Sequence, residues 1–556
     1  MRAVSARRQL LVWALCAAAY LYVFPYQATL NNPNENVRFY MTAALAESGT
    51  YQIDALRARW GWVNDAAVHD GHVYSVKAPG TSWLGVPGYF AYAATRKLGR
   101  TFDRTEALWV CRLTGTILPT LAGIYAFVAF LRRRAHPPLL TCATVISVWL
   151  GSLLYGYGML FVSHTLSAVV AFVAFAFLYE VEQGQREASP LSAAWHGLLA
   201  AAVTWFEYPG LVCSAVLLAY ALYVLRSWKL RVAFALGGVL PALSTMHFQH
   251  VAFGNAFTPG HRFVETEAFR AAHEQGLYGA VAPSAQAVYG LLFEPGAGLF
   301  LLTPLCWFGL YGAVRLCRER STRAAGICLS ALCVLSVLAI SAMNNWRGGW
   351  TIGPRYLAVC LPFLGFAALH GLSQLAARAP VWIEGAALGC SAAALLASGV
   401  PSAYYPHLPP EFTRPLPQLF SVLIAHGFAP LNFGNLLGVW GGVSMLPLLG
   451  VALALLGSAL SWAQRSRAAV GGVALLTAAV CLVPLWLRPR EEPGVQKAVA
   501  FVTGRYSPAG HDQAARLHEA LRAAGPQGDA REWERLRALY LAEGRTAEAA
   551  RAAERR

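Results

Sequence analysis

Two ionisable residues follow the first long apolar run of this sequence closely enough to act together. Glu35 and Arg38 stand one helical turn apart in the segment 31–38, which is rich in asparagine. A carboxylate at this place could accept a proton from a substrate hydroxyl, and the arginine could hold an anion. The asparagines and Glu35 could equally cap a short helix that runs to Glu47, and capping does not exclude catalysis.

A second candidate is Lys77, in the stretch Tyr-Ser-Val-Lys-Ala-Pro-Gly at 74–80. It stands just before Pro79 and the short apolar segment Trp83–Ala94. A lysine here could clamp a phosphate group, or it could extend its ammonium group toward lipid headgroups. Both interpretations stay open.

The residues before Lys77 predict a β-hairpin. Asp70-Gly71 is a turn signal, and Val68 and Val73 flank it as strand residues. Asp65 adds a further carboxylate to the same segment.

A third group of candidates lies in the segment 344–356, which contains Trp-Arg-Gly-Gly-Trp-Thr-Ile-Gly-Pro-Arg-Tyr. Arg347 and Arg355 could grip an anion bidentately, and glycines would let backbone amides approach it. Trp346 and Trp350 could stack on a sugar or a prenyl chain. The alternative is that the tryptophans anchor the loop at a membrane surface while Arg355 extends toward the headgroups.

Three further ionisable residues, His164, Glu207 and Glu294, stand at the ends of apolar runs, where a charge costs less than at the membrane centre. We treat His164 and Glu207 as secondary site candidates. A later group of four potential metal ligands has spacing that fits no recognised metal motif: His247, His250, His261 and Glu265. The sequence has no Walker loop, dinucleotide fingerprint, HExxH helix or GxSxG elbow, so nucleotide chemistry is unsupported.

The composition shows what kind of protein must position these residues. Hydrophobic residues make up 56% of the 556 residues and charged residues only 13%, against about 25% charged in ordinary soluble domains. Disorder, a coiled coil and a secreted disulfide scaffold are excluded. Lysine and arginine outnumber aspartate and glutamate by 44 to 28, an excess that we relate to membrane topology rather than nucleic acid. The eleven cysteines form no CxxC pair and indicate small core residues.

Apolar runs of about 20 residues predict an all-α polytopic membrane protein with about 13 spans. The runs are Leu10–Tyr26, Glu106–Leu131, Leu139–Tyr157, Val162–Tyr179, Leu191–Phe206, Pro209–Leu225, Val232–Val251, Gly298–Val314, Ala324–Met343, Tyr356–Leu375, Val381–Val400, Leu436–Trp462 and Ala468–Leu487. We interpret the first as an uncleaved anchor rather than a signal peptide, because Pro25 and Tyr26 follow it in place of a small-residue cleavage site.

The basic loops predict the orientation. If Trp83–Ala94 is interfacial and does not span, the arginine clusters 132–134, 226–231, 315–323 and 465–467 all fall on the side of the basic N-terminus, as the positive-inside rule requires. The N-terminus is then cytoplasmic. The first outer loop, residues 27–105, would carry interfacial helices and lie outside with the segments 252–297, 344–355 and 401–435.

The chain after its last apolar run changes character. Residues 488–556 are charged and alanine-rich, with apolar positions that fit short helices, so we divide the chain into a transmembrane domain at 1–487 and an outward-facing helical tail at 488–556. The tail is interpreted as a packing or partner-docking appendage.

Taken in order, these motifs resemble the GT-C superfamily of membrane glycosyltransferases, and within it the bacterial relatives of protein O-mannosyltransferases and the lipid A aminoarabinose transferase. The resemblance covers roughly residues 10–375. It implies an inverting transferase that takes a sugar from a polyprenyl-phosphate donor at the outer face of the bacterial inner membrane. The implied acceptor is an envelope lipid, glycan or protein, and the partners are this donor and membrane lipids, without nucleic acid.

The resemblance also assigns roles to single residues. Glu35 corresponds to the first-loop acidic residue, and Lys77 to the basic residue before the proline-rich stretch. Independently of the resemblance, the chemistry of such a transfer makes Glu35 the base, and Lys77 with Arg347, Arg355 or Arg38 the residues that hold the phosphate. His164 stands where the superfamily has a second acidic site. The superfamily usually has aspartate at position 35, two adjacent prolines at 78–79 and a carboxylate at position 164. These departures leave the identity of the base and the use of a divalent metal open.

Two other classes of protein share some of these features. A transporter or flippase would also have many spans with polar residues at one face, but the sequence shows no inverted repeats or paired broken helices. An assembly subunit docked through its tail would tolerate alanine at Glu35, Lys77 and Arg355.

Overall fold

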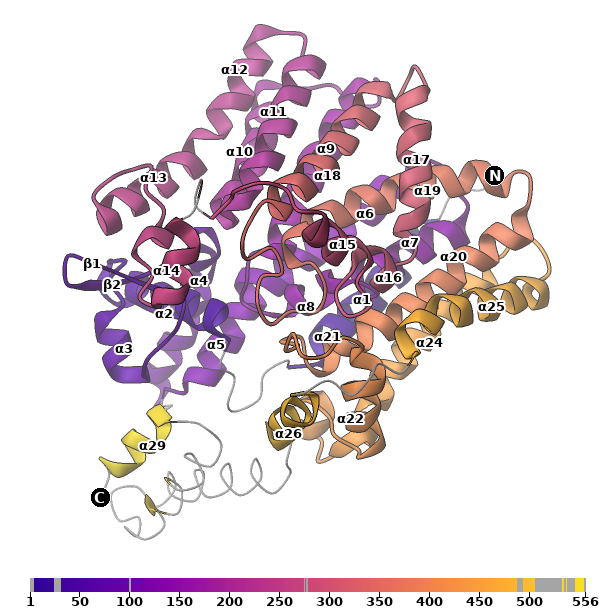
Figure 1. Ribbon diagram of the computed structural model, residues 1–556. Coiled ribbons are helices and arrows are strands. Elements are labelled where there is room, and N and C mark those ends of the chain that lie inside the picture. Colours follow the sequence, from indigo (N-terminus) through magenta and orange to yellow (C-terminus); the bar gives the residue numbers. More distant parts are fainter. Residues whose placement is uncertain are drawn as a thin grey trace.

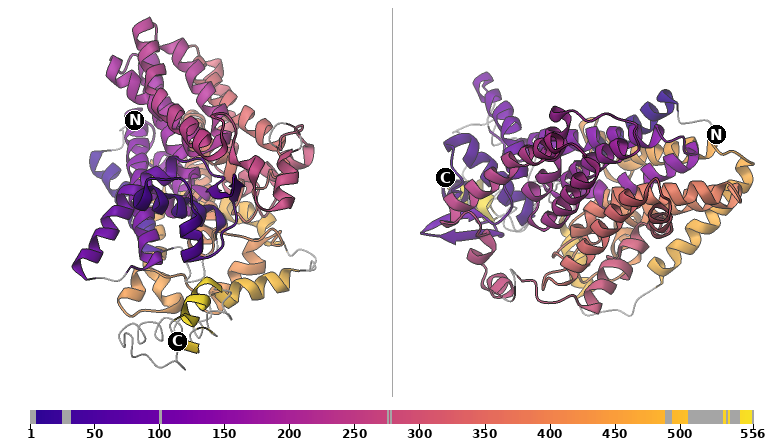
Figure 2. Two further views of the ribbon diagram at one scale, coloured as in Figure 1. Left: turned by 90° about the vertical axis from the view of Figure 1, so that its left-hand side faces the viewer. Right: turned by 90° about the horizontal axis from the view of Figure 1, so that it is seen from above.

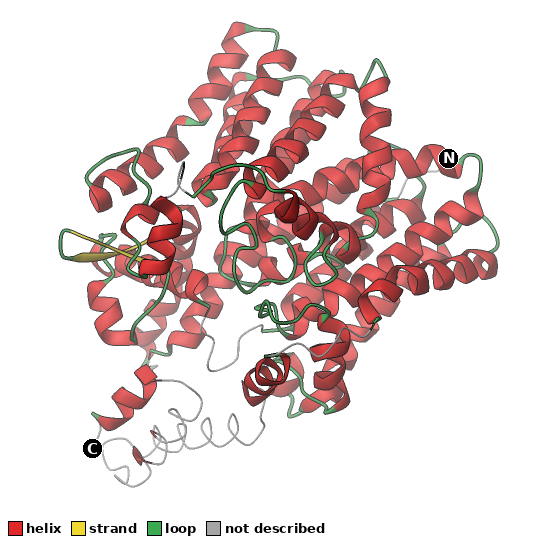
Figure 3. Ribbon diagram, in the orientation of Figure 1, coloured by secondary structure: helices red, strands yellow, loops and turns green. Residues whose placement is uncertain are grey.

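The structure is a computed structural model that describes residues 5–24, 32–99, 102–274, 276, 279–487, 494–505, 533–534, 537 and 546–554. Helices make up nearly all of the regular structure, and the two strands β1 and β2 form one small hairpin (Figure 3). The chain is an α-helical multi-pass membrane protein.

Eight helices in the described part of the chain are long and apolar enough to cross a membrane. They are α5–η2–α6 (Arg104–Arg112, Leu113–Ile117, Leu118–Arg132), α9 (His164–Glu182), α12–α13 (Trp228–Gly237, Val239–Phe253), α18 (Arg323–Ser341), η5–α19 (Arg355–Cys360, Leu361–Ala376), α20–η6–α21 (Pro380–Ala394, Leu395–Gly399, Val400–Tyr404), η8–α24 (Gly441–Met445, Leu446–Ser461) and α25 (Arg467–Trp486). A ninth would be the pair α7 (Pro138–Trp149) and α8 (Leu153–Met159), which is bent by 57°.

The expected count of about 13 spans is not confirmed. The remaining apolar runs form shorter helices: α1 (Ala6–Tyr22), α10 (Pro190–Phe206), η3–α11 (Tyr208–Gly210, Leu211–Val224) and α16–α17 (Leu299–Leu302, Cys306–Arg318). At about 1.5 Å per residue, a helix of 17 residues such as α1 extends about 26 Å, less than the ~30 Å hydrocarbon core. Whether these shorter helices also cross the membrane stays a prediction, because spans of about 17 residues do occur.

The first-loop segment folds into a compact module of α2 (Pro33–Ser48), α3 (Asp54–Trp60), β1 (Ala66–His69), β2 (His72–Ser75), α4 (Gly80–Ala94) and η1 (Thr95–Leu98). Helix α2 begins where Pro33 takes its first position and the Asn32 side chain accepts a hydrogen bond from the Asn34 amide at 3.2 Å. The predicted hairpin is confirmed, with Val68 opposite Val73 across the Asp70-Gly71 turn.

Helix α4, which covers the segment expected not to span, is not among the candidate spans. Two of its glycines allow close packing. A Cβ at Gly85 would lie 2.4 Å from the Phe161 ring, and one at Gly88 would lie 2.1 Å from Thr114 Oγ1. Small residues therefore bring α4 against the helix α5–η2–α6 and the α8–α9 connection.

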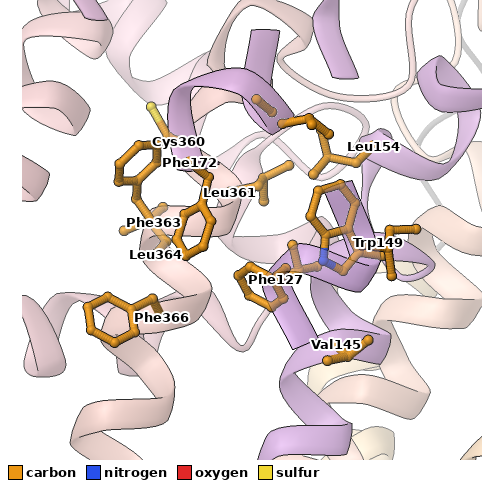
Figure 4. Packing of buried hydrophobic residues seen from close by; sticks show 14 of the residues in the cluster. Phe127, Val145, Trp149, Leu154, Phe172, Cys360, Leu361, Phe363, Leu364 and Phe366 are labelled. Carbon is orange, nitrogen blue, oxygen red and sulfur yellow. The ribbon is translucent and has the colours of Figure 1, made fainter. Parts of the chain in front are cut away.

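The hydrophobic core lies where α6, α7, α8, α9 and α19 meet, and Figure 4 shows its side chains from close by. The rings of Phe127 and Phe172 lie 4.9 Å apart, and those of Phe172 and Phe363 lie 5.5 Å apart. Trp149 is buried beside Phe127. This packing fixes α9 relative to α19, and both helices carry site residues at their N-terminal ends.

The first-loop module and two of the basic loops lie at opposite ends of the molecule. In Figure 1 the module is at the lower left, whereas the connections α11–α12 and α17–α18 are at the top, and the turned view in Figure 2 agrees. The remaining elements are η4 (Gly260–Phe263), α14 (Glu267–Glu274), α15 (Ala285–Phe293), η7 (Leu416–Phe420), α22 (Ser421–Ala425), α23 (Phe433–Leu436), α26 (Val495–Arg505) and α29 (Thr546–Ala553).

Most of the predicted tail lies outside the described residues. Of its described parts, α26 packs against η7, with Val502 buried and the Phe501 ring 5.5 Å from that of Trp350. The division of the chain at residue 487 stays a prediction.

Candidate functional site

A small pocket lies between α9, α10, α11, α18 and η5. Its polar lining residues are His164, Ser167, Glu207, Arg355 and Tyr356. The rest of the lining is small or apolar: Val203, Pro209, Gly210, Cys213, Ser336, Ala339, Ile340, Ala358 and Val359. The pocket thus joins the two secondary candidates with Arg355 of the 344–356 segment.

His164 and Glu207 form a close pair at this pocket. His164 is the first residue of α9, and its Nδ1 lies 2.5 Å from Glu207 Oε2. Glu207 follows the last residue of α10, where the approaching Pro209 disfavours continuation of the helix. Burial by itself raises the pKa of Glu207, but His164 and two nearby arginines, Arg38 and Arg355, outweigh burial and hold that pKa below its ordinary value. The carboxylate is therefore ionised at neutral pH.

Aromatic rings hold the imidazole from two sides. The Tyr157 ring lies 4.8 Å and the Tyr356 ring 5.9 Å from the ring of His164, both edge-on. The Tyr157 hydroxyl is in turn hydrogen-bonded to Thr351 Oγ1. The motif Trp-Thr-Ile-Gly-Pro-Arg-Tyr thus supports His164 through Thr351 and Tyr356.

Several polar atoms around the pocket are buried without a hydrogen-bond partner. These are both ring nitrogens of His164, of which Nδ1 still has its close contact with Glu207, together with Ser167 Oγ and Arg355 Nε. Buried polar groups are nearly always paired in native proteins, so several such atoms at one pocket indicate a site for a polar ligand.

Arg355 begins η5 and is held in position by its own loop. It donates from Nη2 to the Tyr356 hydroxyl at 3.2 Å, and its guanidinium stands 5.0 Å from that ring's centre. Gly348 leaves room for it: Gly348 has a φ of +79°, and a Cβ there would lie 2.6 Å from Arg355 Nε. Because Gly348 has no side chain, the Arg355 side chain can pack directly against its backbone.

Arg38 is almost fully buried and contacts only neutral acceptors. It donates to Asn34 Oδ1 at 2.9 Å, to the Ala78 carbonyl at 3.0 Å and to Ser163 Oγ at 3.0 Å. Burial lowers the pKa of Arg38 to about 10, with Glu207 acting in the opposite direction. The side chain is therefore a cation at neutral pH.

Lys77 makes an ion pair with Asp65, whose Oδ2 lies 3.0 Å from Lys77 Nζ. Asp65 has a φ of 61°, a backbone region that non-glycine residues rarely adopt. Burial raises the pKa of Asp65, but Lys77 most of all, with Arg355 and His261, keeps it below the ordinary value. In this structure Lys77 is therefore paired with a carboxylate, whereas the sequence predicts that it binds a phosphate.

A strap segment, residues 254–274, covers this ion pair. The Glu265 amide donates to the Ala66 carbonyl at 3.0 Å, and the Glu265 carboxylate accepts from Arg57 at 2.7 Å and from Trp62 Nε1 at 3.1 Å. His261 of the strap lies close enough to Asp65 to affect its pKa, after Lys77 and Arg355. The strap, which is the connection after α13, thus packs against the first-loop module.

Glu35 forms a buried ion pair with Arg112, a residue that the sequence analysis missed. Arg112 donates from Nε to Oε1 at 2.5 Å and from Nη2 to Oε2 at 2.6 Å, and the Phe161 amide donates to Oε1 at 2.7 Å. Both side chains are at most 1% exposed. Arg112 is a charge within the apolar run 106–131, and that placement was the signal that could have identified it.

The other sequence candidates lie away from the pocket lining. Arg347 pairs with Glu294 at 2.9 Å. Trp346 packs on α15, where a Cβ at Gly290 would lie 2.2 Å from its ring, and Trp350 contacts Phe501. These residues hold the 344–356 segment in place rather than lining the pocket.

Within the described ranges, no group of three or more His, Cys, Asp or Glu side chains could hold a metal ion. Of the four potential ligands noted in the sequence, His247 contacts the Tyr51 hydroxyl at 3.3 Å and His261 stacks on His273.

No protein-family model and no curated protein matches this chain. Among solved structures, ArnT from Cupriavidus metallidurans bound to undecaprenyl phosphate matches with a TM-score of 0.43 and 18% identity, over 89% of this chain and 83% of ArnT. The archaeal oligosaccharyltransferase AglB from Archaeoglobus fulgidus, in complex with an inhibitory peptide and a dolichol-phosphate, matches with a TM-score of 0.40 and 12% identity, over 84% of this chain and 55% of AglB.

Proposed function

We propose that this chain transfers a sugar from a polyprenyl-phosphate-linked donor to a lipid, glycan or protein acceptor at the outer face of a bacterial inner membrane. One observation carries the proposal. Arg38 is buried and Arg355 half-buried, both close to the pocket, and in the described part of the chain neither has a carboxylate oxygen within 4.0 Å. A cation at such a site without a direct ion pair is costly, so the site is suited to an anionic ligand.

The chemistry of such a donor matches these two charges. A sugar on a lipid phosphate is a phosphodiester with one negative charge, and a second charge develops on the phosphate as the sugar leaves. Cations placed beforehand at that position stabilise the transition state more than the bound donor. Arg38 and Arg355 would supply this stabilisation, and Lys77 would add a third cation once it is released from Asp65.

The lipid part of the donor needs an apolar surface beside the site. Helix α4 exposes Trp83 and Phe90, which are 39% and 54% accessible, next to the segment that carries Lys77. A prenyl chain would lie on this side, and the reacting end of the donor would lie beside the small pocket lined by His164, Ser167 and Glu207.

The proposal is tested by supplying purified protein with radiolabelled sugars on polyprenyl phosphate and, separately, on polyprenyl diphosphate. We expect label to leave the monophosphate lipid. Arg355→Ala should weaken the binding of polyprenyl phosphate about 10- to 150-fold, because a hydrogen bond to a charged group contributes about 1.5–3 kcal/mol.

Arg378→Ala is the matched control, because Arg378 is exposed after the far end of the same span, η5–α19. It should bind donor like the wild type. If no donor loses its label while vesicles containing the protein take up or flip a lipid-linked solute, the chain is a transporter or flippase and the proposal fails.

A further inference from the structure

We propose that His164 is the base that removes the proton of the acceptor hydroxyl, and that Glu207 is the positioning residue that orients it. The inference rests on the proposed function and names the catalytic group of that same site. Neither residue was the first choice from the sequence, which favoured Glu35.

The two imidazole nitrogens have different surroundings. Both nitrogens are buried without a hydrogen bond of standard geometry, but Nδ1 lies 2.5 Å from Glu207 Oε2, an ion-pair contact that Nε2 lacks, and the residue lines the pocket. A carboxylate that accepts the Nδ1 proton fixes the tautomer in which Nε2 carries the lone pair. The free nitrogen is then the proton acceptor offered to a ligand in the pocket.

The surroundings also restrict rotation of the ring. Tyr157 and Tyr356 pack edge-on against it, and the preceding residue, Ser163, accepts a hydrogen bond from Arg38 at 3.0 Å. The phosphate-binding cation and the proposed base are thus linked through one residue of the chain. This arrangement places the proton acceptor near the bond that must break.

Glu35 is less suited to this role in the observed geometry. Both of its oxygens accept hydrogen bonds from Arg112, and Oε1 also accepts one from the Phe161 amide. Both oxygens are therefore already engaged inside the protein, and a substrate hydroxyl could reach either one only by displacing one of these donors.

The step can be written with its atoms balanced. The acceptor oxygen forms a bond to the anomeric carbon, and its proton moves to His164 Nε2. The bond between the anomeric carbon and the phosphate oxygen breaks, and its electron pair stays on the phosphate beside Arg38 and Arg355. Glu207 stabilises the imidazolium that results, which returns its proton to water after the product leaves.

The test compares His164→Ala, His164→Gln and Glu207→Gln in single-turnover transfer and in polyprenyl-phosphate binding. We expect both His164 variants to lower kcat about 100-fold or more, the range of general-base catalysis, with donor binding within threefold of the wild type. Added imidazole should restore part of the activity of His164→Ala and none of that of Glu207→Gln. In Glu207→Gln the ascending limb of the pH–rate profile should move to lower pH, because the neutral amide stabilises the imidazolium less, and Glu207→Asp should recover part of the rate.

His196→Gln is the matched control: His196 is a buried histidine on α10 that stacks on Phe177 away from the pocket. It should keep full activity per folded molecule. The inference is overturned if both His164 variants retain at least a fifth of wild-type kcat. It is also overturned if His164→Ala folds and is not rescued by imidazole while Glu207→Gln is inactive, because Glu207 would then be the base. In each case the wild type still transfers sugar, whereas failure of the proposed function would leave even the wild type without transfer.

Discussion

Asp65 combines two features that rarely occur together in one residue. Its carboxylate is paired with Lys77, and its backbone is in the left-handed region at a φ of 61°. Strain of this kind costs about 1–3 kcal/mol and persists only where the surroundings impose it. Here the strap segment and the hairpin impose it together. We interpret Asp65 as the group that occupies Lys77 until a phosphate replaces it.

This interpretation predicts that Asp65→Asn strengthens the binding of polyprenyl phosphate several-fold, because asparagine tolerates the same backbone conformation but does not compete for the Lys77 charge. Titration of purified protein with the lipid measures the affinity. Asp70→Asn is the control, since Asp70 also has a positive φ in the same hairpin but its side chain is 88% exposed. Weaker binding by Asp65→Asn would instead mean that Asp65 positions Lys77 for the ligand.

The Glu35–Arg112 ion pair leads to a prediction about the stability of the protein. Glu35→Gln leaves a buried guanidinium without its counter-ion and should destabilise the protein by about 3–5 kcal/mol. Arg112→Gln should be similarly destabilising, whereas the double variant should recover much of the loss because no charge is left unpaired. Thermal unfolding in detergent measures all three. A stable Glu35→Gln protein that binds donor but has no transfer activity would support the assignment of Glu35 as the base, made from the sequence.

At the scale of elements, the strap segment should make the stability of the protein depend on pH. Burial, followed by the neighbouring Lys77 and His273, lowers the pKa of His261 to about 3, while Asp65 acts in the opposite direction. The unfolded chain has a histidine pKa of about 6.5. Below that pH the unfolded state binds the additional proton, so stability is full above pH 6.5 and falls as the pH decreases toward 3. Asp65 does not contribute to the pH dependence of stability above pH 4, because its lowered pKa affects stability only below the ordinary carboxyl range.

We therefore expect His261→Gln to lose less thermal stability than the wild type between pH 7 and pH 4.5. Differential scanning calorimetry of the purified proteins at the two pH values measures the change in unfolding temperature. His426→Gln, at an exposed histidine of the α22 end, should behave like the wild type. An unchanged pH dependence in His261→Gln would assign the acid sensitivity to another group.

Local signals predicted local structure well. The Asp70-Gly71 turn and the capping residues of α2 are short-range patterns, and the structure has the hairpin and the helix at those places. The pairing of His164 with Glu207 depends instead on how α9 packs against α10, and no pattern of neighbouring residues encodes that distance. The same holds for Glu35 and Arg112, which are 77 residues apart in the chain.

It was also easier to predict which segment contributes a residue to the site than to predict which of its side chains face the pocket. The segment 344–356 does contribute Arg355 to the pocket, but Arg347 turns to Glu294 and the two tryptophans pack on α15 and α26. Which arginine of a loop faces a ligand depends on the backbone path, and three glycines with positive φ set that path here, Gly348, Gly349 and Gly353.

At the scale of the whole molecule, the sidedness inferred from the basic loops stays a prediction. It places Ser227, between α11 and α12, on the cytoplasmic side and Ala282, before α15, on the side of the first-loop module. Both positions are exposed. In a background without the eleven native cysteines, Ser227→Cys should react with a membrane-impermeant thiol reagent only in inverted vesicles, and Ala282→Cys only in intact cells. Labelling of both from one side would contradict the inferred topology.

The span α5–η2–α6 contains a five-residue π-helical turn, Leu113–Ile117, directly after Arg112. A π-turn accommodates one more residue than an α-turn, and each residue of an α-helix turns the chain by about 100°. Deleting a single residue within 113–117 would thus leave the span as apolar as before yet rotate Arg112 away from Glu35. The residue count of this span is therefore a determinant of the site in its own right, and shortening it by one should do as much damage as removing the arginine.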